Sequence, residues 1–325
     1  MNSPSKEWKE EIASDEAERF EKYAQTFKKI QSIQSKKFGT GRALHRKKIL
    51  SSIASLEIFD AIPNEAKFGL FSKPGNYKVH LRLSNGSMKI QSDSMGDIRG
   101  FAIKVIGLDG ESALGGRADS QSFLLINQES FSSPKSKEFV ELVFALSDGP
   151  ISLLSYLFKT YGLMGTVQKM AQVGKTLGKP FTGFATEKFY SAVPISCGPY
   201  AIKVRISPNA DEPTNKVTDF RSDLKERLEK RNIEFDFQIQ FFINETLTPI
   251  EDASKVWNES DSPFITVGKL VIPKFSFDTE EHKKLEEEIE KNYLDPWNSL
   301  KEHRPLGDIM RARKYAYYAS QSNRK

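Results

Sequence analysis

The sequence contains few of the residues from which disulfides and metal sites are built. Among its 325 residues there is one cysteine, Cys197, and there are four histidines. A single cysteine excludes an intramolecular disulfide and any zinc site that needs several thiolates. The spacing of His, Cys and Asp that is typical of other metal sites is missing as well.

The short motifs of the commonest enzyme classes are also absent. No Gly-x-Gly-x-x-Gly follows an expected strand, and no phosphate-loop signature occurs. The Gly-x-Ser-x-Gly turn of many hydrolases is not found either. These absences disfavour a common cofactor-dependent enzyme or a hydrolase.

Long apolar runs and a strong excess of one charge are lacking too. The longest apolar stretch, residues 151–158, ends at Lys159 and is too short to cross a bilayer. Residues 1–20 are polar and acidic where a signal peptide would be apolar, so we expect a cytoplasmic protein. The net charge of +5 is small, and basic patches such as 46–48 and 323–325 are typical of a solvated surface. We therefore expect no nucleic-acid partner.

Phenylalanine, by contrast, is abundant, with 23 residues against 10 tyrosines and 3 tryptophans. Large apolar rings predict a well-packed interior. Alternatively, some of these rings could line the binding site of a flat apolar ligand. The fractions of hydrophobic and charged residues, 38% and 28%, are typical of a soluble globular protein.

The hydrophobic periodicity alternates along the chain between that of helices and that of strands. Apolar residues at three- and four-residue steps predict one or two helices in 6–38, and helices again in 134–180, 279–292 and the C-terminal tail. No repeat or low-complexity linker intervenes, so we predict one large α+β domain with an antiparallel sheet or barrel. Strands are predicted by alternation and turn signals at 77–83, 99–110, 121–127, 200–208, 235–244 and 264–273.

Three stretches carry the most specific information. They are Arg42-Ala43-Leu44-His45, then Leu81-Arg82-Leu83-Ser84 with Asp97-Ile98-Arg99-Gly100-Phe101-Ala102-Ile103-Lys104, and finally Arg304-Pro305-Leu306-Gly307 with Arg313-Lys314-Tyr315-Ala316-Tyr317. Together they resemble the heme catalase superfamily, whose members carry Arg-x-x-His, Arg-Phe-Ser and Asp-x-Arg-Gly-Phe-Ala-x-Lys in that order. The likeness is greatest to the short catalase-related heme proteins, and it extends over most of residues 40–322.

The resemblance implies a fold, a domain division and a cofactor. The fold would be the catalase-type antiparallel eight-stranded β-barrel with packed α-helices. The catalase-like heme domain would comprise residues 39–325, preceded by an N-terminal helical extension at 1–38. The cofactor would be heme b, iron protoporphyrin IX.

On the distal side of the heme, the resemblance implies that His45 is the acid/base and that Ser84 orients its ring. The family's Asn-x-Pro-x-Phe matches residues 127–131, so Asn127 would orient the peroxide and Phe131 would contact the cofactor, with Glu129 in place of the proline. Histidine suits this role because its near-neutral pKa lets it take a proton and return it.

On the proximal side, the resemblance implies that Tyr317 is the iron ligand and Arg313 its partner, while Arg42 and Arg82 face the heme propionates. A phenol binds iron as the phenolate, although its ordinary pKa is about 10. A guanidinium four residues away on a helix lies on the same face and stabilises the phenolate. Arginines also bind carboxylates through bidentate, charge-assisted hydrogen bonds.

Each of these residues has an ordinary structural role as its alternative. A histidine in a basic run is usually a surface residue, an asparagine at a strand end is usually part of a turn, and a tyrosine on a helix is usually a boundary aromatic. Tyr315 and Tyr318 also compete with Tyr317, which the spacing from Pro305-Leu306-Gly307 favours. The order of the motifs around one specific central element favours the heme site.

The function implied is peroxide-dependent oxidoreductase activity of the catalase or peroxidase type, on a small-molecule peroxide. Two alternatives stay open: rearrangement or cleavage of a fatty-acid (lipid) hydroperoxide at the same heme, and a non-enzymatic heme- or lipid-binding barrel. For a lipid substrate, residues 161–179 offer an apolar entrance, with a plain surface helix as the favoured alternative. A transient membrane contact is a separate expectation for such a substrate. A homo-oligomer is a further expectation.

Overall fold

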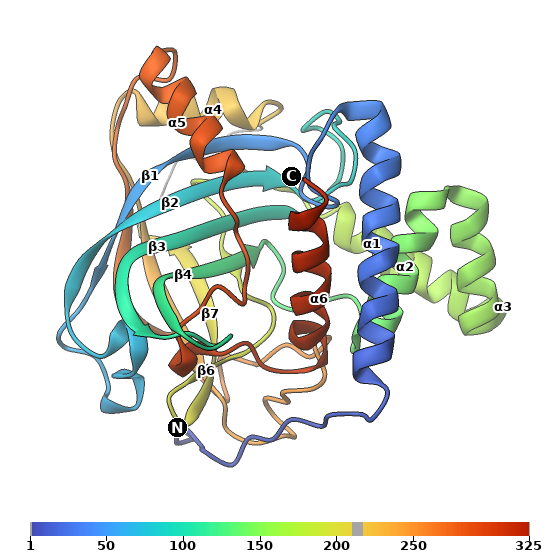
Figure 1. Ribbon diagram of the computed structural model, residues 1–325, viewed down its shortest axis with the longest axis horizontal. Helices are drawn as coiled ribbons and strands as arrows, with labels where there is room; N and C mark the ends of the chain where they lie inside the picture. The colour runs from blue at the N-terminus through green and yellow to red at the C-terminus, as the bar shows by residue number, and fades with distance from the viewer. Residues whose placement is uncertain (1, 210–216, 325) are drawn as a thin grey trace.

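The computed structural model describes residues 2–209 and 217–324, and Figure 1 shows their arrangement. These residues form nine strands and six α-helices. The strands are β1 (Lys48–Ile58), β2 (Gly75–Asn85), β3 (Arg99–Glu111), β4 (Arg117–Ile126), β5 (Phe189–Tyr190), β6 (Ile195–Cys197), β7 (Tyr200–Pro208), β8 (Ile233–Phe241) and β9 (Ile265–Ile272). The helices are α1 (Glu16–Phe38), α2 (Ser136–Asp148), α3 (Pro150–Leu177), α4 (Phe220–Leu228), α5 (Glu280–Lys291) and α6 (Asp308–Ser322).

The strands form one antiparallel sheet that closes into a barrel. Its order is β5-β4-β3-β2-β1-β9-β8-β7-β6, and β5 also pairs with β7. The two residues of β5 make this closure, since Tyr190 pairs with Ile126 of β4 and Phe189 pairs with Ile206 of β7. The closed ring has eight strands, and β6 pairs with the start of β7 outside it. The predicted eight-stranded barrel is confirmed.

The strands with regular alternation lie close to their predicted ranges. Strands β3 and β7 begin at the predicted residues 99 and 200, and α5 differs by one residue at each end from the predicted helix at 279–292. The N-terminal helix begins later than predicted, at Glu16. The sequence analysis did not predict β1, β5, β6 or α4.

Phenylalanine rings from opposite walls fill the barrel interior. The ring centroid of Phe101 on β3 lies 5.0 Å from that of Phe189 and 5.4 Å from that of Phe235 on β8. Phe123 on β4 lies 5.3 Å from Phe237 in the same way. All five side chains are buried, so they contribute to stability mainly through the burial of large apolar surfaces. The abundance of phenylalanine therefore serves the packed core of the barrel.

The helices cover the outside of the barrel. Helices α1 and α6 pack side by side, and α2 and α3 lie beyond α1, whereas α5 packs on β1 and β2 (Figure 1). The segment before α1 is tied to the body, because Glu10 forms an ion pair with Arg311 of α6, which also pairs with Glu16 at the start of α1. The division at residue 38 stays a prediction. None of the described helices has the length and hydropathy needed to cross a membrane.

Candidate functional site

His45 lies in the segment between α1 and β1, and its backbone is fixed on both sides. Its φ of 53° lies in the left-handed region, which is uncommon for a residue other than glycine. Its amide donates to Gly86 O at 2.9 Å, and its carbonyl accepts from Arg82 Nη2 at 3.0 Å. Such a conformation costs on the order of 1–3 kcal/mol and persists only where its surroundings enforce it.

The imidazole of His45 lies against the backbone of Gly100 on β3. Its Nδ1 is 3.1 Å from Ser84 Oγ on β2. A Cβ added to Gly100 would stand 2.5 Å from His45 Nδ1 and 2.9 Å from Ser84 Oγ. The glycine of the Arg99-Gly100-Phe101 motif is therefore required by the close approach of the ring. Ser84 and Gly100 are paired across the sheet, so the register of β2 and β3 positions the histidine.

The electrostatic surroundings of His45 keep its ring neutral. Burial of the ring, together with the positive charges of Arg82, Arg313 and Arg42, lowers the pKa of His45 to about 3. A neutral imidazole can accept a proton, which an imidazolium cannot. Arg313 belongs to α6, and this helix lies close to the His45 segment, since Ala316 of α6 packs in one apolar cluster with Ala43 and Leu44.

Asn127 directly follows β4 and lies next to the strand that supports His45. Its Oδ1 accepts from Arg99 N at 2.8 Å, and its own amide donates to Arg99 O at 3.1 Å. These bonds fix the side chain to β3. Phe131 follows in the same segment, and its ring makes an edge contact with Phe139 of α2 at 5.4 Å.

On α6, Arg313 and Tyr317 form the pair that their spacing predicts. Arg313 Nη2 donates to Tyr317 Oη at 3.0 Å, and the guanidinium lies 5.1 Å from the ring centroid. The other tyrosines of the helix differ. Tyr315 packs against Phe20 of α1, with 5.7 Å between the ring centroids, and Tyr318 is 74% exposed.

Arg42 and Arg82 converge on one carboxylate, that of Glu290 at the end of α5. Arg82 Nε donates to Glu290 Oε2 at 2.7 Å and its Nη2 donates to Oε1 at 3.2 Å. Arg42 Nη1 also donates to Oε1. The sequence analysis assigned these arginines to heme propionates and did not identify Glu290. Periodicity alone predicted the helix at 279–292, and no motif connects residue 290 to residues 42 and 82.

The residues of this site fit a heme with a tyrosine ligand. The donor set contains a phenol oxygen, which is a known axial ligand of heme iron, and that oxygen accepts a hydrogen bond from the Arg313 guanidinium. Arg42 and Arg82 already hold a carboxylate, the group that a porphyrin propionate would present. One apolar cluster adjoins both sides of the site. It includes Ala43 and Leu44, which precede His45, and Ala316, which precedes Tyr317.

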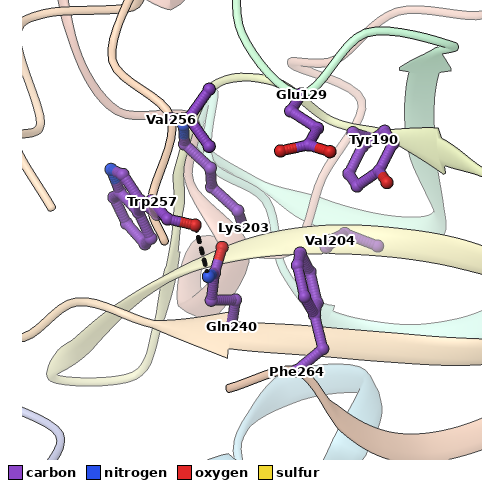
Figure 2. Close-up of a pocket in the computed structure, with 8 residues that line it drawn as sticks. All are labelled: Glu129, Tyr190, Lys203, Val204, Gln240, Val256, Trp257 and Phe264. Atoms are coloured by element: carbon purple, nitrogen blue, oxygen red, sulfur yellow. Dashed lines mark hydrogen bonds between the residues drawn. The ribbon is translucent and has the colours of Figure 1, made fainter. Parts of the chain in front are cut away.

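A separate small cavity is lined by Glu129 and the buried Lys203 (Figure 2). Its volume of about 10 Å³ is no more than one water molecule needs. Burial lowers the pKa of Lys203 to about 7, against the opposing effect of Glu129 and Asp252. Its Nζ donates to Lys255 O at 3.2 Å and lies 4.9 Å from the Trp257 ring centroid. This cavity is too small for a cofactor.

Comparison with solved structures shows the class of fold. A fungal catalase superposes with a TM-score of 0.67 at 18% identity, over 87% of this chain and 59% of that chain. Catalase A from Saccharomyces cerevisiae superposes with a TM-score of 0.68 at 17% identity, over 90% and 63%. A bacterial catalase gives a TM-score of 0.63 at 16% identity, over 100% and 63%. The chain therefore has the catalase fold, as the sequence resemblance implied.

The comparisons also set the limits of this likeness. The chain spans about three fifths of the length of these three catalases. No protein-family model matches the sequence, and a search of curated proteins finds no match either.

Proposed function

We propose that the chain is a heme b protein with peroxide-dependent oxidoreductase activity of the catalase or peroxidase type. The observation that carries this proposal is that two hydrogen-bonded pairs lie close together, His45 with Ser84 and Tyr317 with Arg313. A neutral, fixed His45 lies against Gly100 of β3, and α6 presents Tyr317, whose hydroxyl accepts a hydrogen bond from Arg313. Arg313 lowers the pKa of His45, which supports a single site between the two elements.

The roles of the protein groups follow from their contacts. In the tautomer that donates from Nδ1 to Ser84 Oγ, His45 would have Nε2 free to take a proton from a peroxide oxygen and to return it to the other oxygen. Asn127, fixed to the Arg99 backbone, would orient the peroxide without titrating. Heme, when bound, supplies the iron centre at which the peroxide O–O bond is broken.

Arg313 would position Tyr317 as the iron ligand, because its guanidinium donates directly to the phenol oxygen. Arg42 and Arg82 would bind the propionates in exchange for Glu290. Phe131 would contribute an apolar wall.

A visible spectrum of the purified chain after addition of hemin tests the proposal. We expect a Soret band at one equivalent of heme, and oxygen release or oxidation of an added phenol when hydrogen peroxide follows. A chain that stays colourless would exclude both enzymatic functions and leave a lipid-binding barrel as the function to examine.

A second candidate, conversion of a fatty-acid hydroperoxide at the same site, is favoured by the exposed apolar residues of α3, among them Leu163 and Met164. The two reactions differ in their products. Loss of the conjugated-diene absorbance of a lipid hydroperoxide without oxygen release would identify the lipid reaction, whereas oxygen release from hydrogen peroxide would identify catalase activity.

A further inference from the structure

Helix α3 exposes an unusual amount of apolar surface. Of its 28 residues, two are buried, Leu157 and Thr166. The most exposed of its apolar side chains are Ile151 at 85% exposure, Met164 at 79% and Leu163 at 72%. Leu154, Phe158, Val167 and Met170 of the same helix are exposed as well. Adjacent exposed apolar residues of this number mark an interaction surface rather than ordinary protein surface.

These side chains form a stripe on each half of the helix. Gly162, with a φ of 66°, breaks α3 into two helical halves. Residues 151, 154 and 158 recur at helical spacing on the first half, and residues 163, 167 and 170 do so on the second. Helix α3 packs on α2, and the two project beyond α1 on the side away from the barrel (Figure 1). The stripes therefore lie on a part of the molecule that reaches outward.

The charge of the same segment has one sign. Residues 149–186 contain four lysines and no aspartate or glutamate, although acidic residues are frequent elsewhere in the chain. Lys169 is turned toward the protein, since its Nζ donates to Ser132 O at 2.7 Å. Lys159, Lys175 and Lys179 are exposed. An apolar helix face flanked by lysines is complementary to a lipid bilayer with anionic headgroups. The apolar side chains match the acyl chains, and the lysines match the negative headgroups.

We propose that α3 binds the surface of an anionic phospholipid membrane, with its apolar stripes in the interface and Lys159 and Lys175 at the headgroups. A second copy of the chain is the other occupant to consider. A symmetric contact through α3 would bring lysines against lysines, and residues 149–186 provide no carboxylate to pair with them. The charge pattern therefore favours lipid over self-association. The proposal involves neither heme nor the groups of the candidate site.

Vesicle sedimentation with the purified full chain tests this proposal. One set of vesicles contains phosphatidylcholine alone and the other contains phosphatidylserine as well. We expect binding to the second set only, weakening as salt is raised. Replacing both Lys159 and Lys175 by Gln should lower the partition coefficient about fivefold for each lysine. Leu163→Gln should lower it about tenfold or more.

Matched controls distinguish binding through α3 from non-specific adsorption to the vesicles. Leu114→Gln removes the same side chain from an exposed site on the β3–β4 hairpin, where Leu114 is 54% exposed. Lys73→Gln with Lys274→Gln removes two exposed lysines elsewhere. Both controls should bind like the parent chain. The proposal would be overturned if a control lowered the partition coefficient as much as its matching α3 variant. It would also be overturned if the parent chain bound both vesicle sets equally or bound neither. A dimer in light scattering that Leu163→Gln dissociates, without vesicle binding, would assign the surface to a second copy instead.

Discussion

Replacing Glu290 by Gln tests the part of the site that the sequence did not reveal. The carboxylate accepts two hydrogen bonds from Arg82, at 2.7 and 3.2 Å, and a further one from Arg42. Glutamine keeps the shape and one acceptor oxygen but removes the charge. The Arg82 side chain is 3% exposed, so its charge cannot be solvated by water in compensation.

The expected cost is about 2 kcal/mol in the free energy of unfolding at pH 7. It lies below the values for fully buried pairs because the Glu290 side chain is 35% exposed and water screens part of the charge. Urea unfolding measures this cost as a lower midpoint at an unchanged slope. Glu287→Gln, at an exposed position of the same helix, should change stability by less than about 0.5 kcal/mol.

The pH dependence of this cost has a defined sign. Burial raises the pKa of Glu290, but Arg82 and Arg42 outweigh burial and hold the pKa below its ordinary value of 4.5. The stabilisation is therefore complete above pH 4.5 and is lost as the pH falls through the lower pKa of the folded state. The difference between the parent chain and Glu290→Gln should shrink in acid. A constant difference down to pH 3, or none at pH 7, would refute the reasoning.

If the proposed function is correct, the same substitution has the opposite effect on heme. Glu290 competes with a propionate for Arg42 and Arg82, so Glu290→Gln should bind hemin about tenfold more tightly, which corresponds to about 1.4 kcal/mol. Absorbance titration at the Soret band measures this affinity. Weaker binding than in the parent chain would show that Glu290 supports the heme site rather than competing for it.

Three further substitutions test the remaining contacts. Tyr317→Phe should abolish or strongly perturb the ferric heme spectrum, and an unchanged spectrum would show that another residue is the ligand. His45→Ala should keep heme bound and reduce peroxide turnover by about 100-fold or more, and retained turnover would exclude His45 as the acid/base. Gly100→Ala should destabilise the chain by about 2 kcal/mol or more, because its Cβ meets the His45 ring. Gly174→Ala, which meets no atom within 4 Å, should be neutral or slightly stabilising in the same urea assay.

Much of the fold could be predicted because its strands and helices carry local signals. Strand β3 alternates buried and less buried residues from Phe101 onward, and β7 alternates apolar and polar residues along its sequence. Strand β1 was missed because the serines in KILSSIASLEI weaken its alternation, although its inward residues are buried. Strand β5 has two residues, too few for any periodicity, and it exists because β4 and β7 both pair with it.

The candidate residues of the site were identified from the sequence by itself, because motifs such as Arg99-Gly100-Phe101 and the four-residue spacing of Arg313 and Tyr317 are local along the chain. Their arrangement in space was decided by the tertiary structure alone. The left-handed backbone of His45 depends on Gly86 and Arg82, and the carboxylate on the two arginines comes from Glu290, which follows Arg82 by 208 residues. Hydrogen bonds and ion pairs act between atoms that folding brings together. A long-range partner such as Glu290 therefore leaves no periodic signal in the sequence.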